Sequence, residues 1–218
     1  ARLDSAKVLV CLFLLFVPLV GVSAQPDDDT ITHEVGVWGG FSPDSNTVFR
    51  FGRSADARYG TVAVQYARRF HNNDKVNLKY TVDFVPAAVL DFNDLRFVPT
   101  LVPTGGNTFR EERFRKTAYA WGVAPLGLQV NFRPAKKAQP FVGAAGGFLY
   151  FNKQVPNDFG TKFNFTLDVG GGVEFNLKNK RAVTVGYKYH HISNGYRGEF
   201  NPGYDNNLFY VGYRFFSK

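Results

Sequence analysis

Three residues in the last part of the chain carry the side chains that ester hydrolysis needs. His191 and Ser193 are separated by one residue, and Asp205 follows after a short polar segment. A serine hydroxyl can attack an ester carbonyl when a histidine takes its proton and a carboxylate fixes the histidine tautomer. Asn194 and Gly195 follow the serine directly and are candidate hydrogen-bond donors to the oxyanion. The set predicts acyl-ester hydrolysis, provided that the fold places these side chains on one face.

Alternation of apolar and polar residues indicates the elements that must position them. Within residues 163–177, large apolar side chains take the odd positions, with Gly171 as the single gap, and polar residues or glycines take the even ones. This period of two is typical of a half-buried β-strand. Strands are expected at eight places in all, near residues 31–42, 60–70, 76–84, 126–132, 139–151, 163–177, 181–194 and 206–216.

The connections between these strands alternate in length. Short polar turns are expected at 71–75, 133–138 and 178–180, and longer connections at 43–59, 85–117, 152–162 and 195–205. An up-and-down transmembrane barrel has this form, with short periplasmic turns and long outer loops. We therefore predict an all-β, eight-stranded antiparallel transmembrane β-barrel over residues 25–218, with a bulge or break at Pro125 in the fourth strand.

A soluble barrel of the lipocalin type is the alternative, because turning every side chain to the other face preserves the alternation. The abundance of Gly, Asn, Thr, Asp and Gln on one face favours a polar lumen and a membrane barrel. Trp38 and Trp121 are available for interfacial belts, and Phe215 and Phe216 resemble the terminal aromatic signature of outer-membrane proteins. An eight-stranded barrel is filled by side chains, which argues against a general porin.

The register of the seventh expected strand places the candidate catalytic side chains on the lipid side of the barrel. Val183 and Val185 take odd positions there, and His191 and Ser193 continue them, whereas His190 points into the lumen as a structural histidine. Asp205 has the parity of the apolar positions in the last strand. Residues i and i+2 of a strand lie about 6.5–7 Å apart on one face. We expect a site at the outer-leaflet boundary, where amphiphiles with acyl chains would meet it.

Residues 1–24 form a predicted cleaved signal peptide. Arg2 and Lys7 form a short basic region before a 15-residue, mainly apolar run that ends near Val22-Ser23-Ala24, a small-residue cleavage pattern. Such a run is short for an anchor, which needs about 20 apolar residues. The single cysteine lies inside it, so a disulfide scaffold and a multi-cysteine metal site are excluded. The net charge of +8 on an exported chain favours phosphorylated lipid surfaces over nucleic acid as the acidic partner.

The stretch His191-Ile192-Ser193-Asn194 resembles the H-x-S-N motif of the lipid A 3-O-deacylase family (PagL-type). The resemblance implies an outer-membrane esterase that hydrolyses the ester-linked 3-O-acyl chain of lipid A in lipopolysaccharide, without a cofactor. It implies catalytic roles for His191 and Ser193, and for an acid 14 positions after the histidine. That position holds Asp205, where the better-known members have glutamate. Glu199 is a competing acid that lies outside the family spacing.

A basic stretch in the second long connection and one residue in the last are candidate contacts to the phosphates of lipid A. They are Arg110, Arg113, Arg115, Lys116 and Arg197. Glu111 and Glu112 interrupt the stretch, which favours an ordinary solvated loop. Two other functions stay open at this point: a structural or adhesive membrane barrel and, less favoured, a soluble lipid-binding barrel. A homodimer stays open as well.

Overall fold

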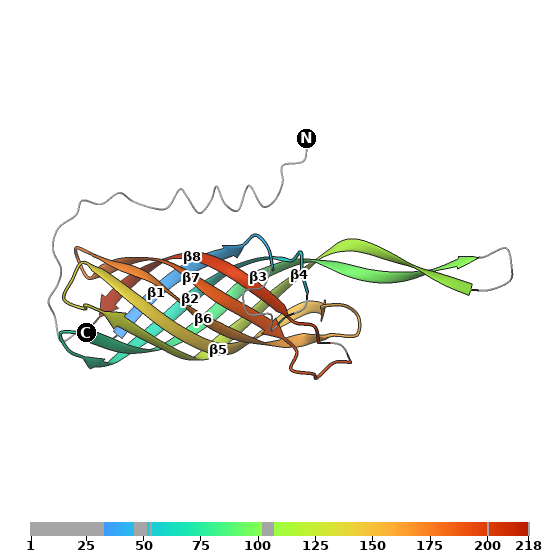
Figure 1. Ribbon diagram of the computed structural model, residues 1–218. Helices are drawn as coiled ribbons and strands as arrows, with labels where there is room; N and C mark the ends of the chain where they lie inside the picture. Colours follow the sequence, from blue (N-terminus) through green and yellow to red (C-terminus); the bar gives the residue numbers. More distant parts are fainter. Residues whose placement is uncertain (1–32, 46–51, 53, 102–106, 200, 218) are drawn as a thin grey trace.

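The structure, a computed structural model, describes residues 33–45, 52, 54–101, 107–199 and 201–217. The expected signal segment, residues 1–24, lies outside this part of the chain. The strands are β1 (His33–Ser42), β2 (Arg58–Asn72), β3 (Val76–Leu101), β4 (Asn107–Phe132), β5 (Ala138–Val155), β6 (Thr161–Leu177), β7 (Arg181–Ser193) and β8 (Tyr204–Ser217). Each pairs with the next in antiparallel register and β1 closes on β8, so the predicted eight-stranded up-and-down barrel is confirmed (Figure 1). No helix in the described ranges has the length and apolarity of a transmembrane helix.

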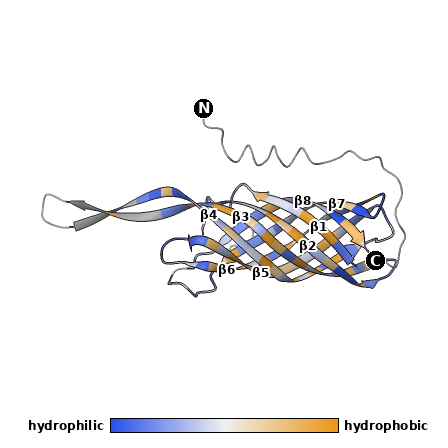
Figure 2. Ribbon diagram, turned by 180° about the vertical axis from the view of Figure 1, so that it is seen from behind, coloured by the Kyte–Doolittle hydropathy of each residue, from blue (hydrophilic) through white to orange (hydrophobic). Residues whose placement is uncertain are grey.

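The outer surface of the barrel is apolar and much of the lumen is polar. In β6 the outward Leu167 and Val169 are 46% and 49% exposed, whereas the alternating Asp168 and Glu174 are buried. Figure 2 shows the resulting change between hydrophobic and hydrophilic residues along the barrel strands. A soluble barrel would bury its apolar face, so this orientation contradicts the lipocalin-like alternative and is that of a membrane barrel.

The long connection expected at 85–117 is wrong, because β3 and β4 continue through most of it. They form a two-stranded hairpin that projects from one end of the barrel and stays paired as far as Leu101 and Asn107 (Figure 1). A bulge at Pro86 interrupts the apolar–polar alternation, so the sequence pattern does not indicate that β3 continues. Asp83 and Val85 point inward before the bulge, and Ala88 and Leu90 do so after it, so the parity of the alternation changes. The bulge predicted at Pro125 is confirmed by the register shift between Val123 and Leu126.

The two tryptophans lie on opposite sides of the wall. Trp121 is outward and 51% exposed, as an interfacial belt requires. The same expectation is wrong for Trp38, whose indole Nε1–H donates to Asp83 Oδ1 at 2.8 Å inside the lumen. The reason is again register, since Trp38 shares its parity on β1 with the buried Glu34.

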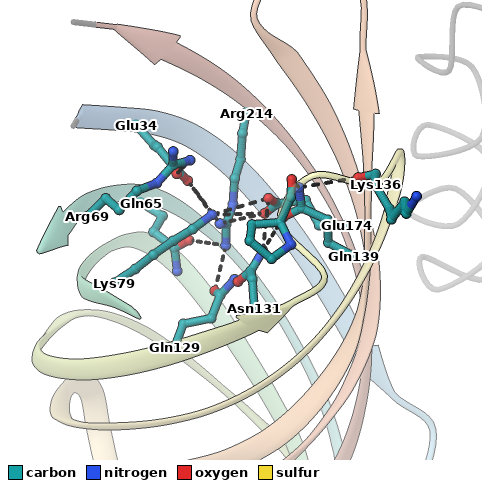
Figure 3. A network of polar contacts seen from close by, with 11 residues as sticks. Glu34, Gln65, Arg69, Lys79, Gln129, Asn131, Lys136, Gln139, Glu174 and Arg214 are labelled. Carbon is teal, nitrogen blue, oxygen red and sulfur yellow. Dashed lines mark hydrogen bonds and ion pairs between the residues drawn. The ribbon is translucent and has the colours of Figure 1, made fainter. Parts of the chain in front are cut away.

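The lumen has two differently filled halves. At the end with the short turns, buried ion pairs join five strands and hydrogen-bonded amides extend the network, and Lys79 and Arg214 each contact both Glu34 and Glu174 (Figure 3). At the end with the hairpin, apolar side chains such as Leu90, Phe92 and Ile192 form a hydrophobic cluster. This cluster supports the strand ends that carry the candidate site.

Candidate active site

The strand ends of β7 and β8 bring the predicted histidine and aspartate together. His191 and Asp205 are directly opposite each other in the antiparallel register, both on the outward side of the wall. The distance between His191 Nδ1 and Asp205 Oδ1 is 2.6 Å. Ser193 lies two residues further along β7 on the same face, partly exposed at the last position of the strand. The three residues therefore lie on one face at the outer end of the barrel, the end from which the β3–β4 hairpin projects.

The carboxylate of Asp205 is buried although it lies on the outward side. Its side chain is 1% exposed, and its second oxygen, Oδ2, accepts a hydrogen bond from the backbone N–H of Gly52 at 2.8 Å. Glu199, the competing acid, lies exposed in the connection between β7 and β8. Gly52 and Gly203 were not singled out in the sequence, because no periodic signal connects the β1–β2 connection with the start of β8.

Two glycines allow the backbone to approach the His–Asp pair closely. A Cβ on Gly203 would lie 2.9 Å from His191 Cε1, and Gly203 has a φ of +65°. A Cβ on Gly52 would lie 2.9 Å from Asp205 Oδ1. The ring of Tyr189 stacks on that of His191, with centroids 6.5 Å apart. The aromatic ring and the close backbone of Gly203 both restrict the orientation of the imidazole.

An apolar wall borders the pair on the side of β6. Phe165 is paired with Ser193 and Leu167 with His191, and both side chains are exposed. Phe163, Phe148 and Trp121 extend this surface through successive ring contacts. Such a surface suits an acyl chain that approaches the serine along the barrel wall.

The turn after Ser193 distinguishes the two oxyanion candidates. The backbone N–H of Asn194 donates to Asn201 Oδ1 at 3.0 Å, and the Asn194 side chain is buried. Gly195 and Tyr196 have φ values of +60° and +59°, and the N–H of Arg197 donates to the carbonyl of Asn194. These φ values fit a type I′ turn. Gly195 is exposed beside Phe165, and its amide is the better-placed candidate of the two.

Four of the five basic candidates lie on the outer part of β4, and three of them, Arg110, Arg115 and Lys116, contact acidic side chains there. Arg110 pairs with Glu112, and Arg115 Nη2 lies 2.7 Å from Asp91 Oδ2. Lys116 Nζ lies 2.9 Å from Asp94 Oδ2 and 3.2 Å from Asp158 Oδ1. Partial burial lowers the pKa of Lys116, but its hydrogen bonds to the two aspartates outweigh this and raise it overall.

Arg113 and Arg197 differ in their positions relative to the serine. Arg113 is exposed on the projecting hairpin, away from the strand end that carries Ser193. Arg197 follows the serine by one turn, and its guanidinium lies 5.3 Å from the centroid of the Phe163 ring. Arg197 therefore lies beside the aromatic wall that borders the candidate site.

His190 lies in the lumen, as its parity predicts. Its Nδ1 is hydrogen-bonded to Asp168, and its ring stacks on Tyr59 with centroids 4.7 Å apart. This second His–Asp pair is buried in the barrel interior and faces away from the outer surface. Both side chains are buried, so the pair belongs to the packing of the barrel interior.

A closed antiparallel barrel with an apolar outer surface and a polar lumen defines a membrane β-barrel of the outer-membrane type. The family model "Lipid A 3-O-deacylase (PagL)" matches residues 45–214, and the chain belongs to this family. The family assignment supports lipid A deacylation as its activity. No curated protein sequence gives a significant match.

Two solved structures agree with the fold. The structure titled "Crystal structure of the outer membrane enzyme PagL" has a TM-score of 0.54 and 15% identity, covering 83% of this chain and 98% of that one. Neisserial surface protein A (NspA) has a TM-score of 0.51 and 14% identity, covering 84% of this chain and 96% of its own. At such low identity these likenesses show the barrel fold alone.

Proposed function

We propose that the protein is a serine esterase of the outer membrane that hydrolyses the ester-linked 3-O-acyl chain of lipid A. Ser193 is the nucleophile, His191 the general base and acid, and Asp205 the group that orients His191. The observation that carries the proposal is the 2.6 Å contact between His191 Nδ1 and Asp205 Oδ1, with the serine two residues away on the same face.

The acylation step follows from the tautomer that Asp205 selects. An Nδ1–H of His191 that donates to Asp205 leaves Nε2 free of a proton and able to accept one. Nε2 takes the proton of Ser193 Oγ as Oγ bonds to the ester carbonyl carbon, and the carbonyl electrons move to its oxygen. The Gly195 amide is the candidate donor to this oxyanion. When the oxyanion collapses, the bond to the sugar 3-oxygen breaks, and Nε2 returns the proton to that oxygen.

The second step regenerates the serine. Water attacks the acyl-serine carbonyl while Nε2 takes a proton from it, and the returning proton restores the Ser193 hydroxyl as the fatty acid leaves. Asp205 stays ionised and stabilises the imidazolium in both steps. Burial of its carboxylate away from water strengthens this interaction.

The surroundings of the site support a lipid substrate. The exposed Phe165 and Leu167 lie beside the nucleophile and the base, so an acyl chain in the outer leaflet can lie on β6 with its ester at Ser193. Arg197 lies at the outer side of this wall and is placed to meet a phosphate of the headgroup. We also infer export through the signal segment 1–24, which would bring the barrel to the outer membrane.

The test follows fatty acid release from lipopolysaccharide by mass spectrometry, using detergent-refolded protein. Wild type is expected to release one 3-hydroxyacyl chain, and Ser193→Ala to lose at least about 10³-fold of the rate, because loss of a triad nucleophile has effects of this order or larger. Ser217→Ala, at the opposite end of the barrel, is the matched control and should retain wild-type activity. No release by folded wild type would favour a structural barrel instead, and equal release by Ser193→Ala would exclude this nucleophile.

A further inference from the structure

The carboxylate of Asp205 is held from two directions by elements far apart in the sequence. Oδ1 contacts His191 Nδ1, and Oδ2 accepts the backbone N–H of Gly52 at 2.8 Å, from a residue 153 positions earlier. One hydrogen bond would leave the carboxylate free to rotate about its Cβ–Cγ bond. Two bonds, one to each oxygen, fix both the position and the plane of the group. The β1–β2 connection therefore completes an arrangement that β7 and β8 begin.

We propose that Gly52 is a positioning residue for the esterase, acting through Asp205. This inference rests on the proposed function. It adds that ester hydrolysis depends on the β1–β2 connection as well as on β7, which carries His191 and Ser193. A donor behind the acid keeps its near oxygen aimed at Nδ1 throughout the reaction. Residues that hydrogen-bond to a catalytic side chain and fix its orientation are typical of active sites with well-defined geometry.

The close approach explains why this position holds glycine. A Cβ on Gly52 would lie 2.9 Å from Asp205 Oδ1, 2.9 Å from the carbonyl oxygen of Gly203 and 3.0 Å from the Asp205 nitrogen. Two of these three atoms belong to the backbone and cannot move aside as a flexible side chain would. An added methyl group must therefore displace the Gly52 amide from the carboxylate.

The connection is fastened next to this contact. The N–H of Ser54 donates to the Gly203 carbonyl at 3.2 Å, and Ser54 forms an isolated parallel bridge with Tyr204. Ser45 Oγ donates to the Ser54 carbonyl and accepts the N–H of Ala57. The Gly52 amide is thus presented by a segment that is itself hydrogen-bonded, so the donor is preorganised for the acid.

A double-mutant cycle separates positioning from general support of the fold. Gly52→Ala is expected to lower kcat for fatty acid release by about 10- to 100-fold, the size associated with one hydrogen bond to a charged group, with KM unchanged. In an Asp205→Ala background, the same change should have almost no further effect, because the group through which Gly52 acts is gone. Asp56→Gly, which alters an exposed side chain of the same connection, is the matched control and should keep wild-type kcat. Heat-modifiable gel mobility shows that each variant is folded.

A second measurement tests the contact without relying on activity. In ¹⁵N-labelled protein, Asp205→Asn should shift the Gly52 amide proton upfield, because a neutral amide is a weaker acceptor than a carboxylate. Equal losses from Gly52→Ala in both backgrounds, full activity of Gly52→Ala, or an unmoved Gly52 resonance would each overturn the positioning role while leaving the esterase intact. An inactive, folded wild type would overturn the proposed function and this inference together.

Discussion

At the scale of single residues, the register explains how an aspartate at position 205 can act as the acid of the proposed triad. His191 and Asp205 are direct partners across β7 and β8. Opposed residues of an antiparallel pair have Cα atoms about 4.5–5.5 Å apart, so a short acid reaches the imidazole without any shift of the strands. A longer acid would have to fit into space that the backbone of Gly52 and Gly203 already closes.

Substitutions of Asp205 should therefore follow an unusual order. Asp205→Asn is expected to lower kcat by at least about 100-fold, because the amide favours the wrong histidine tautomer. Asp205→Glu keeps the charge but is expected to lose about 10-fold or more, because one extra methylene overfills a tightly packed position. Steady-state release of fatty acid from lipopolysaccharide measures both.

Glu199→Gln serves as the control for these variants, since its side chain is exposed in the adjoining connection. We expect it to match wild type. If Glu199→Gln lowered kcat as much as Asp205→Asn, the catalytic acid would have been misassigned. A fully active Asp205→Glu variant would show that the space around Asp205 is less restricted than the glycine contacts indicate.

Parity along the chain was sufficient to predict part of this site. It placed His191, Ser193 and Asp205 outward and His190 inward, and the structure has them so. It could not predict the Gly52 contact, because a hydrogen bond from an irregular connection leaves no period in the sequence. Trp38 shows the opposite error, since residue type suggested the membrane belt while the register of β1 turned the indole to Asp83.

At the scale of elements, the barrel strands were predictable and the hairpin was not. Alternation is continuous within β6, but Pro86 adds a bulge to β3 and moves the inward positions from odd to even. A single period therefore fits only the part of β3 before the bulge. The pairing continues past the barrel because β4 offers a partner for each residue of β3, from Ala88 with Ala120 to Leu101 with Asn107.

Shortening this hairpin tests whether its arginines take part in substrate binding. Asp94 and Phe114 are paired, so an Asn-Gly turn joining them would remove residues 95–113 and keep the register below. We expect a folded barrel whose kcat/KM for lipopolysaccharide stays within about twofold of wild type, the range of changes remote from a site.

Arg197→Ala supplies the comparison, because this arginine lies beside the aromatic wall next to the serine. It should raise KM, while the shortened hairpin should not. A large rise in KM on shortening the hairpin, with Arg197→Ala unchanged, would assign headgroup recognition to the hairpin.

At the scale of the whole molecule, the lumen acts as the rigid support of a site on the outer wall. Beneath the strand ends of β7 and β8, Ile192 and Leu208 are almost completely buried in the hydrophobic cluster. Further along the barrel, Lys79, Arg69 and Arg214 face Glu34 and Glu174 across five strands. Because this network spans the lumen, it fixes these five strands relative to one another and helps to hold the outward residues in register.

The charge balance of the network predicts its response to substitution. Glu174 accepts from Lys79 at 3.2 Å, Arg214 at 2.8 Å and Asn131 at 3.1 Å, and all four side chains are buried. Glu174→Gln would leave three cations opposite Glu34 alone, and breaking a buried pair in this way costs about 3 kcal/mol of the free energy of unfolding. Adding Lys79→Met should recover much of the loss, because it returns the network to the wild-type excess of one positive group, with Arg69 and Arg214 facing Glu34. Urea unfolding in lipid vesicles measures these changes, with Glu199→Gln as the exposed control.

The same variants test whether the network affects catalysis. Because the network lies at the far end of the barrel from Ser193, the folded variants should keep wild-type kcat. A fall in kcat without a fall in stability would mean that the network acts on the site directly and not through the rigidity of the wall.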